Sequence, residues 1–287
     1  MIIKDRDSRK RDIRELKKLL SFYNLSPKQR FLIEREIYAI KRGESGEEDS
    51  AYYINFYYGD SKNWAVIHDL RIEFNGKAAQ IDHILINRFF DIYVLESKNY
   101  RYGLRITESG EFEVKYKNYY IGIPSPIEQN KRHIELLSKF IKAQNLLPKR
   151  VGIKIQPRFF NYILVSPKAI IRRPKSKKFD FSNVIKADML ATIIEKNTEE
   201  INTLDTFKYV FKMSSFSIVE EFAKKLVAYH KPITIDWIKR FGIKDVKRYF
   251  CFKCGAMISE NEAKFCWNNK KKFKGKAFCF KCQKEFY

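Results

Sequence analysis

Two apolar runs decide the fold of this chain: Ala79-Gln80-Ile81-Asp82-His83-Ile84-Leu85-Ile86 and Phe90-Asp91-Ile92-Tyr93-Val94-Leu95-Glu96-Ser97-Lys98. Each has the length and the apolar content of a buried strand. Because side chains alternate faces along a strand, Val94, Glu96 and Lys98 share one face. Asp82 faces the same way as Ile84 for the same reason. If the two runs pair as a hairpin, Asp82, Glu96 and Lys98 meet at its end.

Such a meeting point has a chemical use. Two carboxylates can hold a hard divalent cation, and an ammonium group beside them offsets negative charge, a combination that suits hydrolysis of a phosphodiester. The alternative is an exposed salt bridge, because acid–lysine pairs are common on hairpins and are usually solvated. The apolar surroundings favour the first interpretation, since a buried charge is costly unless it is paired or bound to a metal.

The flanking segments predict further strands and a helix. Asn75-Gly76 is a strong hairpin signal between residues 64–74 and the Asp82 run. Residues 127–143 have the periodicity of an amphipathic helix. Additional strands are expected at 103–106, 111–116 and 159–165, the last being a continuous apolar run typical of a buried central strand. Together these elements predict an α/β fold, a mixed sheet flanked by helices.

The N-terminal region carries a different pattern. Apolar residues recur at helical spacing within residues 8–42, and Ser26-Pro27 fits a helix start. Gly43 and Gly46 predict a turn, after which Glu47 opens a new helix. Acids in a first helical turn are favoured by the helix dipole, which is the alternative explanation for Glu47.

Length and composition limit the classes of protein. A chain of 287 residues with 45% hydrophobic and 15% aromatic residues is expected to fold and has room for more than one unit. Its apolar runs fall short of the roughly 18 residues of a membrane-spanning helix. The first residues lack the apolar core of a signal peptide. We therefore expect a cytoplasmic protein without a membrane partner.

Charge points to a polyanionic partner. Lysine and arginine number 57 against 34 acids, a formal charge of +23, which suits nucleic acid or an anionic membrane surface. Residues 239–287 hold fourteen basic residues against four acids, and residues 1–42 hold thirteen against six. Because the amphipathic basic helix of a membrane-surface protein is missing, we expect nucleic acid, held by the basic ends. Charge kept for solubility is the alternative.

Several short motifs occur in order over residues 40–145: Gly46-Glu47, Gln80-Ile81-Asp82-His83, Leu95-Glu96-Ser97-Lys98-Asn99-Tyr100, Gly103 and Pro126-Ile127-Glu128-Gln129-Asn130. In this order they resemble the nuclease-related domain (NERD) family, which is similar to the restriction-endonuclease-like PD-(D/E)xK superfamily. Ser97 and Ser125 stand where other residues are commoner in that pattern. Neither departure changes a charge.

The resemblance implies a role for each polar motif residue. Asp82 and Glu96 would be the main carboxylate ligands of Mg²⁺ or Mn²⁺, with a backbone carbonyl as a further oxygen. Lys98 would orient or help to deprotonate the attacking water and offset charge on the phosphate. Glu47 would hold a metal-bound water or a second ion. Gln129 would position water or phosphate.

Other conspicuous side chains receive structural roles. His83 points to the face opposite Asp82 and is expected to be a core or supporting histidine rather than a metal ligand. The tyrosine pairs at 52–53 and 57–58 are expected to pack a helix rather than stack on bases. The remaining histidines lie in no cluster and receive no role: His68, His133 and His230.

The C-terminus carries a second candidate site. Two CxxC motifs, separated by 24 residues, contain Cys251, Cys254, Cys279 and Cys282. Paired CxxC motifs without a secretion signal predict a zinc ribbon with these four ligands, and two disulfides are the alternative. Four thiolates leave no position for water, so this zinc is expected to be structural. The fifth cysteine, Cys266, is expected to pack in the core, although it can replace one of the four.

A lysine-rich loop runs between the two motifs. With Phe273 among them, its five lysines predict a surface that grips phosphates, and a solvated loop is the alternative. The five are Lys270, Lys271, Lys272, Lys274 and Lys276. Upstream, residues 166–178 predict a basic connector, and residues 183–196 and 216–230 predict helices that cap the core or lead to the ribbon.

The expected organisation has four parts: basic N-terminal helices (1–42), a NERD nuclease-like core (43–170), a helical extension or connector (171–245) and a zinc ribbon (246–287). The expected function is a Mg²⁺- or Mn²⁺-dependent nuclease that hydrolyses phosphodiester bonds of DNA. The alternative is a non-catalytic nucleic-acid-binding or adaptor protein on the same scaffold. The complete acid–acid–lysine set argues against it, because a pure binder gains by losing carboxylates that repel phosphate.

Overall fold

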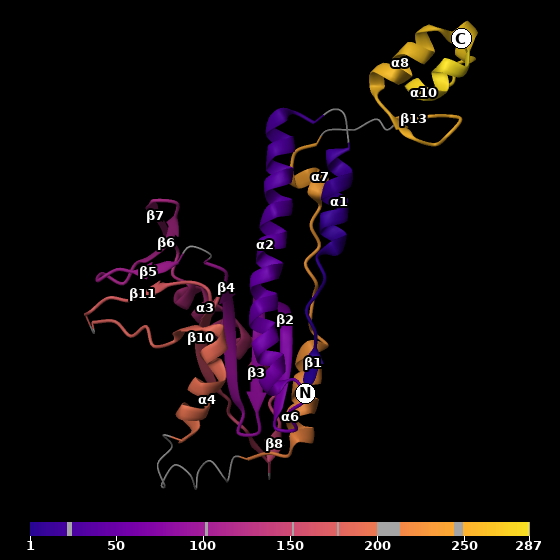
Figure 1. Cartoon of the computed structure of the whole chain (residues 1–287). Helices are drawn as coiled ribbons and strands as arrows, with labels where there is room; N and C mark the ends of the chain where they lie inside the picture. The colour runs from indigo at the N-terminus through magenta and orange to yellow at the C-terminus, as the bar shows by residue number, and fades with distance from the viewer. Residues whose placement is uncertain are drawn as a thin grey trace. The chain divides into compact units, whose positions relative to one another are not determined.

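The computed structural model describes residues 1–21, 25–100, 103–150, 152–176, 178–199, 213–243 and 249–286 (Figure 1). The chain divides into two compact units. The first contains Met1–Ser8 and Lys41–Ile233, and the second contains Arg9–Ile40 and Thr234–Tyr287. The long helix α2 (Pro27–Tyr58) contributes residues to both.

A mixed six-stranded sheet forms the centre of the first unit, with the strand order β1-β2-β3-β4-β10-β12. Strands β2, β3 and β4 are antiparallel neighbours. Strand β1 runs parallel to β2, and β10 runs parallel to both β4 and β12. The bounds are β1 (Ile2–Lys4), β2 (Trp64–Phe74), β3 (Lys77–Asn87), β4 (Asp91–Lys98), β10 (Arg158–Val165) and β12 (Val184–Lys186).

Alternation along the strands gives this sheet two apolar faces. Ile84 and Val94 belong to one core cluster, and their neighbours Leu85 and Tyr93 belong to another. The first cluster includes residues of α3 (Pro126–Ala143) and α6 (Phe216–Val227), and the second includes residues of α2 and α4 (Leu190–Glu199). Helices therefore flank both faces of a mixed sheet, and the predicted fold class is confirmed.

A smaller four-stranded sheet has the order β11-β5-β6-β7. Its bounds are β5 (Leu104–Ile106), β6 (Phe112–Tyr116), β7 (Tyr119–Ile123) and β11 (Ile171–Arg172). Leu104 and Phe112 share a buried cluster with Ile163 and Val165 of β10, so the small sheet packs against the large one. The first unit also contains the two-stranded pair β8 (Lys149–Arg150) and β9 (Ile153–Lys154).

The predicted turn at Gly43 and Gly46 is wrong, because α2 runs through both glycines without a break. Gly46 is buried, and a Cβ atom there would lie 2.6 Å from Asn99 Cβ. This glycine therefore permits a close approach between α2 and the segment after β4. Glu47 lies in the middle of a helix, so a helix dipole does not explain it. Neither α2 nor another helix among the described residues is apolar over a stretch long enough to cross a membrane.

Two further expectations need correction. A helix is predicted for residues 183–196, but the segment begins with strand β12 and a 3-10 turn (Ala187–Met189) before α4 starts. The tyrosine prediction is half wrong: Tyr53 and Tyr58 pack against the core, whereas Tyr52 and Tyr57 are 64% and 51% exposed. The helix expected at 216–230 is present as α6.

The second unit contains two apolar clusters. One joins Leu16 of α1 (Lys10–Leu20), Ile33 of α2 and Trp237 of α7 (Trp237–Arg240). The other is the core of the C-terminal ribbon, centred on Cys266 and Phe273. The ribbon consists of β13 (Tyr249–Phe250), β14 (Met257–Ile258), α8 (Glu260–Asn268), α9 (Lys270–Phe273), α10 (Phe280–Gln283) and a 3-10 turn (Lys284–Phe286).

Candidate active site and zinc centre

The pairing of β3 with β4 brings the three charged residues to one end of the hairpin. His83 lies opposite Leu95, so Asp82 and Glu96 occupy the next positions on the two strands. The backbone N–H of Ser97 donates to Asp82 Oδ2 over 2.8 Å. Lys98 Nζ donates to Glu96 Oε1 over 2.6 Å. The convergence expected from strand alternation is therefore present.

Helix α3 adds Gln129 to this group. Gln129 Nε2 donates to Glu96 Oε1 over 2.8 Å, and Gln129 Oε1 accepts from Lys98 Nζ over 3.3 Å. The helix starts here because Ser125 caps its N-terminus and a proline occupies its first turn. Asn130 fastens it to the sheet, since its Nδ2 donates to the Val94 carbonyl over 2.7 Å.

Helix α2 supplies Glu47, the third carboxylate. Its Oε2 lies 3.7 Å from Arg6 Nη2, which also donates to the Glu44 carbonyl over 3.0 Å. Burial raises the pKa of Glu47 to about 7, with the charges of Asp69 and Glu96 adding to the rise and Arg6 opposing it. The pKa of Glu47 therefore depends on the charges of other acids of the site.

The site holds more negative charge than its cations offset. Removal from bulk water, together with the charges of Glu96 and Glu47, raises the pKa of Asp82 well above its usual range, although the Ser97 N–H and Lys98 oppose the rise. Glu96 is 3% exposed, and its Oε2 is buried without a hydrogen-bond partner. A buried carboxylate oxygen in this state is costly. The arrangement therefore favours a positively charged ligand.

His133 is a site residue that the sequence did not reveal. Its Nδ1 lies 3.6 Å from Glu96 Oε2 and likewise has no hydrogen-bond partner. Burial lowers the pKa of His133, while Glu96 opposes this shift. The available signal was its spacing of one helical turn from Gln129, which places both side chains on the same stripe of α3.

A buried chain of hydrogen bonds supports the site from the opposite face of the sheet. His83 Nε2 lies 2.9 Å from Ser97 Oγ, its Nδ1 lies 2.7 Å from His68 Nδ1, and His68 Nε2 lies 2.9 Å from Asn55 Oδ1. Because Asn55 Oδ1 can only accept, His68 Nε2 donates to it, His83 Nδ1 donates to His68, and the Ser97 hydroxyl donates to His83. Burial lowers the pKa of His68 to about 4, in keeping with two neutral rings.

Comparison with protein families identifies the region that holds this site. Residues 42–166, from α2 to the end of β10, match the family described as the nuclease-related domain. These residues form a nuclease-related domain. The resemblance drawn from the motifs is thereby confirmed, and the match extends beyond residue 145 to include the central strand β10. Comparisons with curated proteins and with solved structures give no match.

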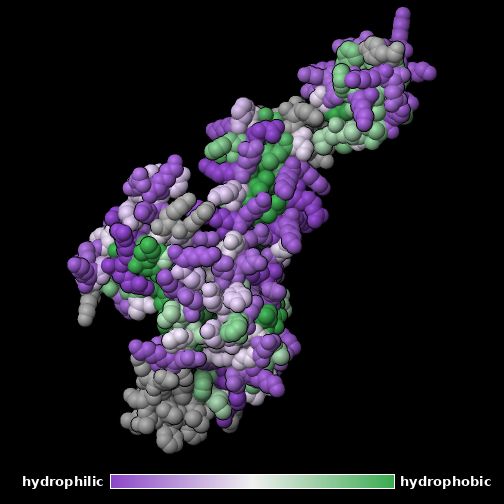
Figure 2. Space-filling model, viewed as in Figure 1, coloured by the Kyte–Doolittle hydropathy of each residue, from purple (hydrophilic) through white to green (hydrophobic). Residues whose placement is uncertain are grey.

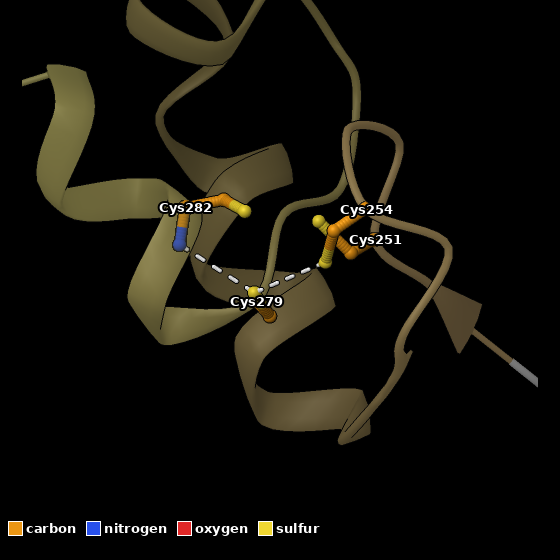
Figure 3. Close-up of side chains that lie close together, drawn as sticks. All are labelled: Cys251, Cys254, Cys279 and Cys282. Atoms are coloured by element: carbon orange, nitrogen blue, oxygen red, sulfur yellow. Dashed lines mark hydrogen bonds between the residues drawn. The ribbon is translucent and has the colours of Figure 1, made fainter.

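Beyond the nuclease-related domain, four cysteines form a group that can hold a zinc ion (Figure 3). Their sulfur atoms all lie within 4.8 Å of one another, and Cys254 Sγ is 3.7 Å from Cys279 Sγ. Tetrahedral zinc with bonds near 2.3 Å separates its sulfurs by about 3.8 Å. Neighbouring thiols, led by Cys279, raise the pKa of Cys282 to about 12, so full ionisation of the group needs a cation.

Cys266 lies outside this group, as expected. Its buried Sγ accepts from the Phe278 N–H and from Gln283 Nε2, each over 3.3 Å, in the ribbon core. Among the described residues no other set of three His, Cys, Asp or Glu ligands is as compact as the four cysteines.

The lysine-rich loop differs from its prediction. Lys270–Phe273 forms the short helix α9, and Phe273 is 1% exposed, so its ring packs in the ribbon core instead of facing a ligand. Four of the five lysines are exposed, and Lys272 is half-buried. Exposed aromatic rings occur instead within the CxxC motifs, at Phe252 and Phe280. Lys276 Nζ lies 3.6 Å from the ring centre of Phe252.

Proposed function

We propose that this protein is a metal-dependent nuclease that hydrolyses phosphodiester bonds of DNA. The observation that carries the proposal is the Asp82–Glu96–Lys98 group at the end of one hairpin, with a buried, unpartnered oxygen on Glu96. The nuclease-related family of residues 42–166 supports it.

The donor set fits a hard divalent cation. Asp82 and Glu96 would hold Mg²⁺ or Mn²⁺, and Glu47 would bind a metal-coordinated water or a second ion. Such sites use one or two carboxylates and keep several waters. What the bound ion supplies is a more acidic water and a polarised phosphoryl oxygen. The raised pKa values of Asp82 and Glu47 support this assignment, since burial and neighbouring carboxylates disfavour both negative charges and a bound cation would offset them.

The protein side chains orient the reactants. Lys98 lies between Glu96 and Gln129, where its ammonium group can turn toward a scissile phosphate and offset the charge that develops on it. Gln129 forms hydrogen bonds with both Glu96 and Lys98. It would exchange one of these hydrogen bonds for one to water or phosphate. Asp82 is held toward this group by the Ser97 N–H.

The remaining surface would hold the substrate. The chain carries a formal charge of +23, and hydrophilic residues cover most of the face drawn in Figure 2. A structural zinc ion held by the four cysteines would keep the ribbon rigid, and its lysines would contact phosphates. Among the described residues the four cysteines are the one compact group of three or more possible metal ligands, which favours a second candidate function, a non-catalytic nucleic-acid-binding or adaptor protein.

A cleavage assay distinguishes the two. The full chain is incubated with supercoiled plasmid and with linear DNA in Mg²⁺, Mn²⁺ or EDTA. The proposal requires cleavage that depends on metal and is lost in Asp82→Asn and in Lys98→Met. Glu135→Gln is the matched control, because this exposed acid of α3 forms a surface ion pair with Lys139 and lies outside the acid–acid–lysine group. DNA binding without cleavage by the wild type supports the adaptor.

A further inference from the structure

The hairpin of β6 and β7 extends an apolar face beyond the core. Its paired residues are Phe112 with Ile123, Val114 with Ile121, and Tyr116 with Tyr119. Directly opposed residues share one face of a hairpin. At the base of this face Phe112 is 2% exposed, whereas toward the turn Ile121, Tyr116 and Tyr119 are 44%, 45% and 54% exposed.

The two tyrosines form an open aromatic surface at the turn. Their ring centres are 5.4 Å apart, with the planes at 65°. They flank a two-residue connection in which Lys117 has a φ of 51°. A clustered aromatic surface left in water by a folded domain marks an interaction site more often than an isolated exposed ring does.

The charge of the small sheet indicates the partner. Its strands and the β6–β7 turn carry Arg105, Lys115, Lys117 and Arg172 against a single acid, Glu113. Glu113 is paired with Arg105 over 2.5 Å, and Arg105 also lies 3.7 Å from the ring centre of Tyr120. The acids of the β5–β6 loop lie at the opposite end of the hairpin from the tyrosines. Arg105 and Lys115 lie on the face opposite the tyrosines, whereas Lys117 lies in the turn itself, with its Nζ 6.0 Å from the ring centre of Tyr116. The turn end therefore combines a cation with the aromatic surface.

Backbone hydrogen bonds connect this hairpin to the candidate active site. The Tyr100 N–H donates to the Lys98 carbonyl over 3.2 Å, the Gly103 N–H to the Tyr100 carbonyl over 2.9 Å, and the Lys115 N–H to the Gly103 carbonyl over 3.1 Å. Gly103 has a φ of 114°, and a Cβ atom there would lie 2.9 Å from the Ile170 carbonyl oxygen, so the connection needs a glycine. The turn end is thus anchored to the strand that carries Lys98.

We infer that the β6–β7 hairpin binds single-stranded nucleic acid, stacking unpaired bases on Tyr116 and Tyr119 while Lys117 contacts a phosphate. Aromatic rings among lysines are the usual platform for single strands, because an unpaired base offers its flat face whereas a duplex hides it. The inference rests on the proposed function: the hairpin would deliver an unpaired segment to the site at Lys98.

The test measures binding without cleavage. Fluorescence anisotropy of the full chain in EDTA is recorded with a labelled single-stranded oligonucleotide and with a blunt duplex of the same sequence. Loss of one stacked base costs about 1 kcal/mol or more, so Tyr116→Ala/Tyr119→Ala is expected to weaken single-strand binding at least fivefold and duplex binding far less. Tyr116→Phe/Tyr119→Phe keeps both rings and is expected to bind like the wild type.

Tyr52→Ala removes a similarly exposed tyrosine from α2, close to Glu48 and Asp49, and is the matched control with unchanged binding. The inference is overturned if the Tyr116→Ala/Tyr119→Ala variant binds single strands within twofold of wild type, if it loses duplex binding equally, or if it changes only the oligomeric state. A wild type that binds single strands through the hairpin but never cleaves contradicts the nuclease proposal alone. If the Tyr116→Ala/Tyr119→Ala variant binds single strands like the wild type and cleaves normally, the binding role of the hairpin is wrong and the nuclease proposal stands.

Discussion

Gly46 offers a test of how α2 is placed against the end of β4. Substitution by alanine puts a Cβ atom 2.6 Å from Asn99 Cβ, and ordinary contact begins at 3.4 Å, so one segment must move by about 0.8 Å. Overpacking of this kind costs roughly 1–3 kcal/mol. Alanine also favours a helix over glycine by up to about 1 kcal/mol, which offsets part of the cost.

Gly43 provides the control on the same helix. It is exposed, and a Cβ atom there meets nothing within 4 Å. Gly43→Ala therefore gains the helix propensity alone and is expected to stabilise the protein by up to about 1 kcal/mol. The difference in unfolding free energy between the two variants isolates the steric cost, about 1–3 kcal/mol. It is measured by urea unfolding of the metal-free protein.

Glu47 follows Gly46 and Lys98 precedes Asn99, so the same displacement is expected to move Glu47 relative to Lys98. A misplacement near 1 Å costs up to about 100-fold in rate, so metal-dependent cleavage by Gly46→Ala is expected to fall by about 10- to 100-fold, while Gly43→Ala cleaves like the wild type. Equal unfolding free energies and equal cleavage rates in the two variants would refute the reasoning, because Gly46 would then have no steric role.

Three further outcomes are expected. Because Glu47 binds its proton more tightly in the folded state, its contribution to the free energy of unfolding falls as the pH rises from about 4.5 to about 7. Glu47→Gln is expected to flatten this fall, measured by urea unfolding in EDTA at several pH values. Parallel wild-type and variant profiles would contradict the raised pKa of Glu47. Purified protein is expected to contain one zinc ion per chain, measured by elemental analysis, and to lose it in Cys254→Ser but keep it in Cys266→Ala. Zinc retention in Cys254→Ser would rule out the four-cysteine centre. Replacing the five ribbon lysines by glutamine is expected to make the plot of log affinity against log salt concentration less steep. Its slope falls in magnitude by about 0.7–0.9 for each phosphate that the ribbon no longer neutralises. An unchanged slope would exclude these lysines from DNA binding.

The hairpin and its charged end were predictable because they depend on local rules. The period of two along the strands places Glu96 and Lys98 on one face, and the Asn75-Gly76 turn brings β2 and β3 together. The helix signal around residues 127–143 likewise located Gln129. These features need only the sequence near each residue, so the fold class and the position of the acid–acid–lysine group followed from it.

Other features depend on contacts between distant segments. Gly46 signals a turn locally, but its buried contact with Asn99 explains it as a point of close helix packing. His68 and His83 are fifteen residues apart and meet only because β2 and β3 pair in that register. His133 reaches Glu96 only after α3 docks on the sheet.

The central claim is tested most directly by Mn²⁺ binding, measured by isothermal titration calorimetry on the zinc-loaded full chain. The account predicts that the wild type binds Mn²⁺ and that Asp82→Asn and Glu96→Gln each abolish this binding while unfolding no more readily than the wild type. Unaltered Mn²⁺ binding in both variants would contradict it, because the two carboxylates would then form no cation site.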